Sequence, residues 1–505
     1  MKTLEYIENY NAYQPYMLLN FNLSFEKDIA HDDICRTVIE VVEEVNIARY
    51  VDFTNRNAHG YDGVMMFKLI MLAMADSGYV STRKLSKLCK TDIRYMFIAQ
   101  NQKPSHQAFQ RFIHDDLTMP IEDIFYEINK YIESKIFINT DVLCIDGTKY
   151  EANANKNTFV WRANTIRNRT KRWKKVILCL KKINKYFTEQ NIALNYSLLK
   201  EPSIEYMLAV ADGIERYMKD YNIEFVHGKG KRKSDIQRLY DELKEHAIKL
   251  WEYAIHMELL GSRNSFSKTD PDATFMHMKY DYYNHTNVFK PGYNVQIGVS
   301  DGYIRNIYIS SDGNDLRTYI PFMEKYKSAY GRLPKKTPAD AGYGSYDNYM
   351  YCLKNGMELV MKYPMYAKKK EAKYKKQTYN PANWETDEEG YKVCPEGKRF
   401  DQYLSDRIDE SGVYPRIIQR VTSQEECSGC PRKSECCKSK SGRKILSRDV
   451  VLNEFYQKVD ENLSTEYGKE LKKQRSIQAE GAFGVIKEDM KFTRFTRRGL
   501  KNTRM

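Results

Sequence analysis

The sequence predicts an α/β protein in which a mixed sheet forms the core and helical segments precede and interrupt it. Short strand-like runs, rich in apolar and β-branched residues, occur at 142–145, 293–299, 303–309 and 357–361. Helical periodicity dominates residues 1–138 and returns between the strand-like runs. Strands that alternate with helices along a chain are typical of a sheet covered by helices.

Residues 1–138 are expected to form a helical domain. Apolar residues recur at helical spacing in 38–45 and 65–74, and two shorter helices are expected at 81–90 and 105–113. A pair of short helices is compatible with DNA binding and equally with simple packing, so both interpretations stay open.

The core begins with the run 142–145, which predicts a short buried strand ending in a turn at Asp146-Gly147. Asp301-Gly302 lies between two strand-like runs and predicts a hairpin, because a primed turn needs positive φ at both central residues. Helices are expected at about 316–330, 346–354 and 471–487. The core is expected to comprise 139–152, 269–364 and 465–505.

Three acidic residues accompany these elements: Asp146 after the first strand, Asp340 before the helix at 346–354, and Glu480 on the last helix. Taken singly, each is more simply a turn residue or part of a solvated helix face. Together they suit phosphodiester chemistry, in which two divalent cations about 4 Å apart activate a hydroxyl and stabilise the leaving oxygen. Carboxylates are the ligands that Mg²⁺ prefers.

Residues 153–268 are expected to form a helical insertion. Ser234 and Gln237 make a capping box, and an apolar stripe follows until Gly261. With an opposing helix at 171–187, the segment predicts an antiparallel arm whose tip, near Lys231, is basic. DNA contact, dimerisation and a purely structural hairpin are all compatible with this pattern.

Residues 365–464 are expected to form a second, cysteine-rich insertion. Cys427 and Cys430 form a CxxC pair, Cys436 and Cys437 follow, and Cys394 stands in a separate turn. Four thiolates suffice for a closed tetrahedral Zn²⁺ site, although free thiols remain the alternative because a second CxxC is missing. Histidines such as His277 and His285 lack a metal-ligand spacing and are read as packing or solvated residues.

The charge balance favours a polyanionic partner. Lys and Arg number 81 against 67 Asp and Glu, a net charge of +14, although solubility alone would also account for it. Basic runs at 167–175, 229–233 and 368–376 concentrate cations that can displace counterions from phosphates. The candidate DNA contacts in the first two runs are Arg167, Arg169, Lys171, Arg172, Lys231 and Arg232.

The chain has no apolar stretch of membrane-spanning length and its first residues lack a signal-peptide core, so a cytoplasmic, nucleoid-associated protein is expected. It also lacks a GxxxxGK[ST] segment that would indicate ATP-driven chemistry.

Five motifs in a fixed order give the chain a wider resemblance. They are Ile145-Asp-Gly-Thr148, Thr269-Asp-Pro-Asp-Ala273, Gly292-Tyr-Asn-Val-Gln296, Ala339-Asp-Ala-Gly-Tyr343 and Glu480-Gly-Ala-Phe-Gly484. With Lys487 seven residues after Glu480, they resemble the DDE transposases of bacterial insertion sequences, whose catalytic core is RNase H-like. The resemblance extends over nearly the whole chain.

The resemblance implies that Asp146, Asp340 and Glu480 bind two catalytic Mg²⁺ or Mn²⁺ ions and that Lys487 meets a DNA phosphate. Similar transposases carry a tyrosine and an arginine within two turns before the glutamate, where this chain has Lys473 and Ser476. Arg475 lies beside the expected arginine position, so its contact with DNA is an open prediction.

The resemblance further implies a structural Zn²⁺ held by Cys394, Cys427, Cys430 and Cys436, with Cys437 as the spare thiol. The implied activity is metal-dependent cleavage at the ends of a mobile element followed by attack of the 3′-hydroxyl on target DNA. The implied partners are terminal inverted repeats, target DNA and a second copy of the chain. Two alternatives stay open: a stand-alone RNase H-like nuclease, and a non-catalytic DNA-binding relic, which the absence of a further helix after Met505 would favour.

Overall fold

The computed structural model describes residues 25–50, 60–228, 230–278, 288–437, 439 and 441–504. Residues 1–24 and 51–59 of the expected helical domain, Lys229 of the second basic run, and His285 lie outside the described residues. The chain divides into two compact units, Met1–Tyr131 and Ile132–Met505, and each is described by itself.

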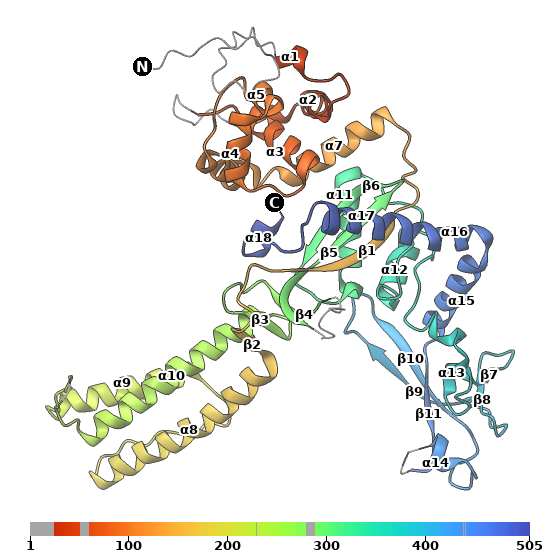
Figure 1. Ribbon diagram of the computed structural model, residues 1–505. Helices are drawn as coiled ribbons and strands as arrows, with labels where there is room; N and C mark the ends of the chain where they lie inside the picture. Colours follow the sequence, from red (N-terminus) through yellow and green to blue (C-terminus); the bar gives the residue numbers. More distant parts are fainter. Residues whose placement is uncertain are drawn as a thin grey trace, which may run out of the picture. The chain divides into compact units, whose positions relative to one another are not determined.

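The first unit is helical (Figure 1). Helices α4 and α6 begin after Ser81 and Ser105, whose hydroxyls accept hydrogen bonds from main-chain N–H groups three residues ahead, at 3.3 and 3.2 Å. The helices expected at 38–45, 65–74, 81–90 and 105–113 correspond to α2, α3, α4 and α6 and are confirmed. The elements are α1 (Phe25–Asp28), α2 (Ile34–Glu44), a 3₁₀ turn (Ile47–Arg49), α3 (Gly63–Ser77), α4 (Thr82–Thr91), α5 (Ile93–Ile98), α6 (His106–Arg111), a π-helical turn (Phe112–Leu117) and α7 (Ile121–Lys135), which continues into the second unit.

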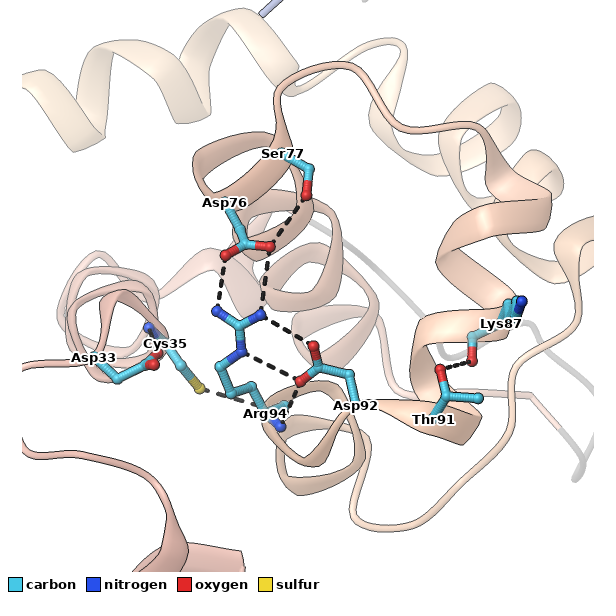
Figure 2. A network of polar contacts seen from close by, with 8 residues as sticks. All are labelled: Asp33, Cys35, Asp76, Ser77, Lys87, Thr91, Asp92 and Arg94. Carbon is cyan, nitrogen blue, oxygen red and sulfur yellow. Dashed lines mark hydrogen bonds and ion pairs between the residues drawn. The ribbon is translucent and has the colours of Figure 1, made fainter.

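Arg94 connects three helices of this unit (Figure 2). Its guanidinium donates to Asp76 near the end of α3 at 2.8 Å and to Asp92, the N-cap of α5, at 3.0 Å. The Arg94 carbonyl accepts a long contact from the Cys35 thiol of α2 at 4.0 Å. The arginine therefore fixes the α5 start against α3 and α2.

Among the described residues, no single helix is long and apolar enough to cross a membrane. Helices α3 and α4 reach that length and composition only as a pair, and they meet at an angle of 96°.

The second unit is built on a sheet whose central strand is β5 (Figure 1). Strand β5 pairs antiparallel with β1, β4 and β6. The strands are β1 (Cys144–Glu151), β4 (Thr274–His277), β5 (Phe289–Ser300) and β6 (Tyr303–Ser310). The β5–β6 turn has φ of 48° at Asp301 and 85° at Gly302, which confirms the expected primed hairpin.

Two further segments add to this sheet, and each runs parallel to its neighbour. Residues 335–340 run beside β1, with Leu143 and Ile145 N–H donating to the carbonyls of Lys336 and Pro338 at 3.0 Å each. Glu358 N–H then donates to Lys335 O at 2.8 Å, which adds the segment 357–361. The order β6, β5, β1, 335–340, 357–361 is a mixed sheet, so the predicted α/β RNase H-like class is confirmed.

The first strand differs from its prediction. A turn was expected at Asp146-Gly147, but β1 continues to Glu151 because residues 147–151 pair with 292–296 of β5. Gly147 is required by packing: a Cβ there would lie 2.4 Å from the Gln296 side-chain nitrogen. Alternation along β1 places Ile145 on one face of the sheet and Asp146, Thr148 and Tyr150 on the other.

Each face of the sheet is covered by an apolar layer. On the Ile145 face, α11 (Tyr319–Tyr330) and α12 (Tyr346–Lys354) contribute Phe322 and Tyr349, together with Phe455 of α15 (Val450–Ser464). On the Tyr150 face, the C-terminal segment contributes Phe483 and Phe495. Asp146 therefore faces the C-terminal helix.

The helical insertion begins and ends at a two-stranded sheet, β2 (Phe159–Trp161) with β3 (Ser265–Ser267). The Ser234 N-cap and the end at Gly261, with φ of 51°, are confirmed, but the capping box is incomplete because the Gln237 side chain bonds the main chain of Val226 at 3.0 and 2.9 Å. The opposing helix expected at 171–187 is present, but the arm also has a third, unexpected helix, which packs against the other two through Met207, Val210 and Ile214. The three helices are α8 (Arg162–Glu189), α9 (Ile204–Asp220) and α10 (Asp235–Leu260) (Figure 1).

The cysteine-rich insertion contains a three-stranded antiparallel sheet in the order β11-β10-β9. Its small core is formed by Trp384, Phe400 and Val421. The elements are two 3₁₀ turns (Lys368–Lys370 and Pro381–Asn383), α13 (Ala372–Lys375), β7 (Glu385–Thr386), β8 (Lys392–Val393), β9 (Gln402–Asp409), β10 (Arg416–Thr422), α14 (Lys433–Cys436) and β11 (Ile445–Arg448).

Candidate active site

The helix that carries Glu480 contains two π-helical turns. It starts as α16 (Glu466–Arg475), passes through a π turn (Ser476–Glu480), continues as α17 (Gly481–Gly484) and ends with a second π turn (Val485–Asp489). Hydrogen bonds in a π turn span five residues, so Arg475 and Glu480 come onto the same face. The Arg475 Nη2 lies 3.2 Å from Glu480 Oε1. The extra residue of the π turn explains why Arg475 is one position earlier than the resemblance expects.

Arg475 also reaches Asp146. Its Nη1 lies 3.4 Å from Asp146 Oδ2, and the two side chains are only 9% and 16% exposed, whereas Glu480 is 61% exposed. One guanidinium thus lies between carboxylates that are 334 positions apart in the sequence (480 minus 146).

The surroundings of Asp146 shift the pKa of its carboxyl group. Burial raises its pKa to about 6, while Arg475 and the Gly147 N–H, which donates to Asp146 Oδ1 at 3.0 Å, oppose the increase. The negative charges of Asp340 and Glu480 raise this pKa further. All three acids therefore share one electrostatic neighbourhood.

Asp340 ends the parallel segment beside β1. Its Oδ1 accepts a hydrogen bond from Gly342 N–H at 2.8 Å, which turns the chain towards α12. Lys362 is close to this turn, since its N–H donates to Ala339 O at 3.3 Å. Burial and the nearby Arg475 lower the pKa of Lys362.

A cleft of about 770 Å³ opens over the edge of β1, with Asp146, Glu480 and Lys487 among its lining residues. Asp340 is not part of this lining. The Lys487 ammonium donates to Thr148 Oγ1 at 2.5 Å and lies 4.9 Å from the centre of the Tyr150 ring. Lys487 and Glu480 therefore face the same cleft.

The sequence reasoning missed Asp315, another carboxylate that lines the cleft, and Asn294 beside it. Asp315 opens a 3₁₀ turn (Asp315–Arg317) just before α11. Asn294 Nδ2 donates to Asp315 Oδ1 at 2.7 Å. The sequence signal that could have found Asp315 is the pair of amides Asn294 and Gln296 within a strand that is buried along most of its length. Buried amides need hydrogen-bond partners, and Asp315 is one of them.

The carboxylates have the right chemistry for Mg²⁺ or Mn²⁺, because all their donor atoms are oxygens. The Arg475 guanidinium lies where a cation would neutralise Asp146 and Glu480. In the described parts of the chain, however, no three His, Cys, Asp or Glu side chains are close enough together to hold an ion. His277 also lines the cleft, but it does not complete such a group of three side chains.

The cysteines of the second insertion come together around a small cavity of about 20 Å³. Lys398 N–H donates to Cys394 Sγ at 3.3 Å, and the Lys444 ammonium donates to Cys436 Sγ at 3.1 Å. Both contacts place a hydrogen-bond donor against a sulfur. The cysteines that line the cavity are Cys394, Cys427, Cys430, Cys436 and Cys437.

The candidate DNA contacts outside the cleft lie on the helical insertion. Arg167, Arg169 and Lys171 are exposed on α8, while Arg172 is half-buried and lies 3.6 Å from Glu245 of α10. Lys231 and Arg232 are exposed in the loop before α10.

Comparison with protein families gave two matches. A family described as a transposase DDE domain matches residues 393–505, and a family described as a transposase domain matches residues 23–115. Comparison with curated proteins gave no match, and neither did comparison with solved structures. The stretch 116–392, which holds Asp146 and Asp340, lies between the two matched regions.

A mixed α/β core with acidic side chains at one cleft, in a chain with two regions that match transposase families, indicates a transposase, a class of enzyme that acts on DNA. More particularly, the two matches support a DDE transposase of insertion-sequence type.

Proposed function

We propose that this transposase cleaves DNA at the ends of an insertion sequence and joins the freed 3′-hydroxyl to target DNA, with divalent metal ions at Asp146, Asp340 and Glu480. The observation that carries the proposal is the contact of Arg475 with both Asp146 and Glu480 at one cleft. Asp340 supports it by lying close enough to raise the pKa of Asp146. Because two element ends must be processed together, two copies of the chain are expected on the DNA.

Asp146, Asp340 and Glu480 would hold two Mg²⁺ or Mn²⁺ ions. When bound, such ions activate the attacking hydroxyl and stabilise the leaving oxygen of a phosphodiester. The half-buried position of Asp146 limits water at the cleft floor and strengthens charge interactions there. Lys487 is positioned to receive a backbone phosphate, and Arg475 can contact DNA only by giving up one of its carboxylate partners.

The helical insertion is proposed as a second DNA contact. Helix α8 carries ten Lys and Arg residues against one Glu. Some of these charges are already paired, as Lys182 is with Glu242 at 3.3 Å and Lys185 with Glu189 at 3.5 Å. Arg169 and Lys171 are exposed, which leaves them available for phosphates.

The cysteine cavity is proposed to hold a structural Zn²⁺ through Cys394, Cys427, Cys430 and Cys436. The support is their common cavity and the N–H and ammonium donors that face two of the sulfurs. Such an ion would stabilise an insertion whose buried apolar core is small.

The catalytic proposal is tested with DNA that carries the ends of the element encoding this chain. In Mg²⁺, the wild-type chain should cut these ends and join them to a target plasmid, whereas Asp340→Asn should do neither. Glu358→Gln is the matched control, because Glu358 lies on the neighbouring parallel segment and pairs with Lys336 at 3.0 Å. It should retain wild-type rates.

The same assay separates the two alternatives. Cleavage without joined products would indicate a stand-alone nuclease. DNA binding without turnover, unchanged by Asp146→Asn, would indicate a non-catalytic relic.

The DNA contact of α8 is tested by its salt dependence. Replacing Arg169 and Lys171 with Ala should weaken DNA binding and reduce the slope of log K against log[salt] by about 0.9 for each phosphate that the variant no longer neutralises. Replacing the ion-paired Lys182 and Lys185 on the same helix should leave the slope nearly unchanged. Equal slopes for all variants would exclude α8 from the interface.

A further inference from the structure

Asp315 is held at the cleft by a buried polar network from the central strand. Its Oδ1 accepts hydrogen bonds from Asn294 Nδ2 at 2.7 Å and from Gln296 Nε2 at 3.0 Å. Gln296 Oε1 in turn accepts from the Tyr343 hydroxyl. Asn294, Gln296 and Tyr343 are all fully buried. The network fixes which oxygen of Asp315 faces the strand.

The second oxygen of Asp315 points to the neighbourhood of Asp340. A Cβ placed on Gly342 would lie 3.4 Å from Asp315 Oδ2 and 3.0 Å from Asp340 Oδ1, so the two carboxylates approach the same point from different sides. Within the described part of the chain, Asp315 Oδ2 has no hydrogen-bond partner. A side chain larger than hydrogen at residue 342 would intrude between the two oxygens.

Tyr343 links the two carboxylates. Its N–H donates to Asp340 O at 3.3 Å, and its hydroxyl donates to Gln296 Oε1. Tyr343 therefore connects the main chain at Asp340 with the network that holds Asp315.

We propose that Asp315 is a fourth carboxylate of the active site, which directs Oδ2 at the divalent cation held beside Asp340. This inference rests on the proposed function. Anchoring two amides needs only one acceptor oxygen, which an asparagine would also supply, so the network alone does not explain a carboxylate here. Because the hydrogen bonds to Oδ1 already fix the Asp315 side chain, Oδ2 can bind a cation without a further loss of side-chain freedom. Hydrogen bonds from neighbouring residues orient metal ligands in the same way in other metal sites.

The test is Asp315→Asn in the full chain, since Asn keeps the oxygen that accepts from Asn294 and Gln296. Binding of Mn²⁺ is measured by the decrease of the free-ion EPR signal, without DNA. Asp315→Asn should weaken Mn²⁺ binding about tenfold while the unfolding midpoint without metal stays at the wild-type value. Asp460→Asn is the matched control, because that carboxylate accepts from Tyr363 at 2.7 Å outside the cleft, and it should bind Mn²⁺ like the wild type.

The outcomes separate this inference from the function on which it rests. If the wild type binds Mn²⁺, Asp146→Asn does not, and Asp315→Asn binds like the wild type, then Asp315 is only a structural anchor and the inference is overturned. If the wild-type chain binds no Mn²⁺ at all, the proposed metal-dependent function fails. A lowered midpoint for Asp315→Asn with unchanged Mn²⁺ affinity also overturns the inference.

Discussion

Asp146→Asn is expected to stabilise the protein at neutral pH while abolishing its activity. The pKa of Asp146 is raised from 3.8 to about 6 in the folded chain, mainly by burial. A difference of about 2 units, at about 1.4 kcal/mol each, means that folding with an ionised Asp146 costs about 3 kcal/mol at pH 7. Asparagine removes this cost because it carries no charge in either state.

The difference in stability between the wild type and Asp146→Asn should change with pH in a defined direction. Below about pH 4 the carboxyl is protonated in both the folded and the unfolded chain, so wild type and variant should be equally stable. Between pH 4 and pH 6 the folded chain binds more protons than the unfolded one, so the wild type should lose stability relative to the variant as pH rises. Above pH 6 the difference should be constant, at about 3 kcal/mol. The contribution of Arg475 is already contained in the raised pKa.

The assay is urea unfolding in EDTA at pH 4 and pH 7.5. Asp141→Asn is the control, because Asp141 lies just before β1 with 54% of its side chain exposed, and it should change stability by less than about 0.5 kcal/mol. Adding Mg²⁺ should narrow the gap, since only the wild type gains binding energy. A variant less stable than the wild type at pH 7.5, or a difference that does not depend on pH, would refute the reasoning.

Three further changes have defined outcomes. Arg475→Met leaves two carboxylates without their cation, so the free energy of unfolding at pH 7 should fall by about 3 kcal/mol in urea titrations, and an unchanged value would contradict the pairing. Cys427→Ser should lose one equivalent of zinc in metal analysis and lower Tm, whereas Cys437→Ser should keep the metal; equal loss in both would contradict the assignment of the spare thiol. Gly147→Ala places a Cβ against the Gln296 amide and should cost about 1–3 kcal/mol in the same titrations, so a neutral effect would argue against this close packing.

Local signals in the sequence were sufficient to predict an element where residues adjacent in the chain determine its structure. The Asp301-Gly302 turn follows from its need for positive φ, and the start of α10 follows from the Ser234 side chain. These elements needed no information about distant residues, and the structure has them where the pattern indicates.

The errors arose where a distant segment decides the structure. Gly147 looks like a turn residue, but its lack of a side chain serves Gln296 of the neighbouring strand, and the pairing with β5 carries β1 through it. The π turn before Glu480 is invisible to a 3.6-residue period, although it determines that Arg475 faces the glutamate. Asp315 was missed because its meaning depends on two amides about 20 positions away.

The α9 helix was missed for a different reason. Met207, Val210, Ala211, Ile214 and Met218 follow helical spacing, so the signal was present. The helix after it, capped by Ser234, and the basic helix before it already form a complete helical hairpin. Nothing in the spacing of the apolar residues required a third helix.

The central claim is that Asp146, Asp340 and Glu480 share divalent cations, and anomalous diffraction from crystals of the full chain with Mn²⁺ tests it most directly. The account predicts manganese peaks in contact with oxygens of all three carboxylates, with Arg475 turned away from at least one of them. Manganese bound elsewhere, with Arg475 still between Asp146 and Glu480, would contradict it.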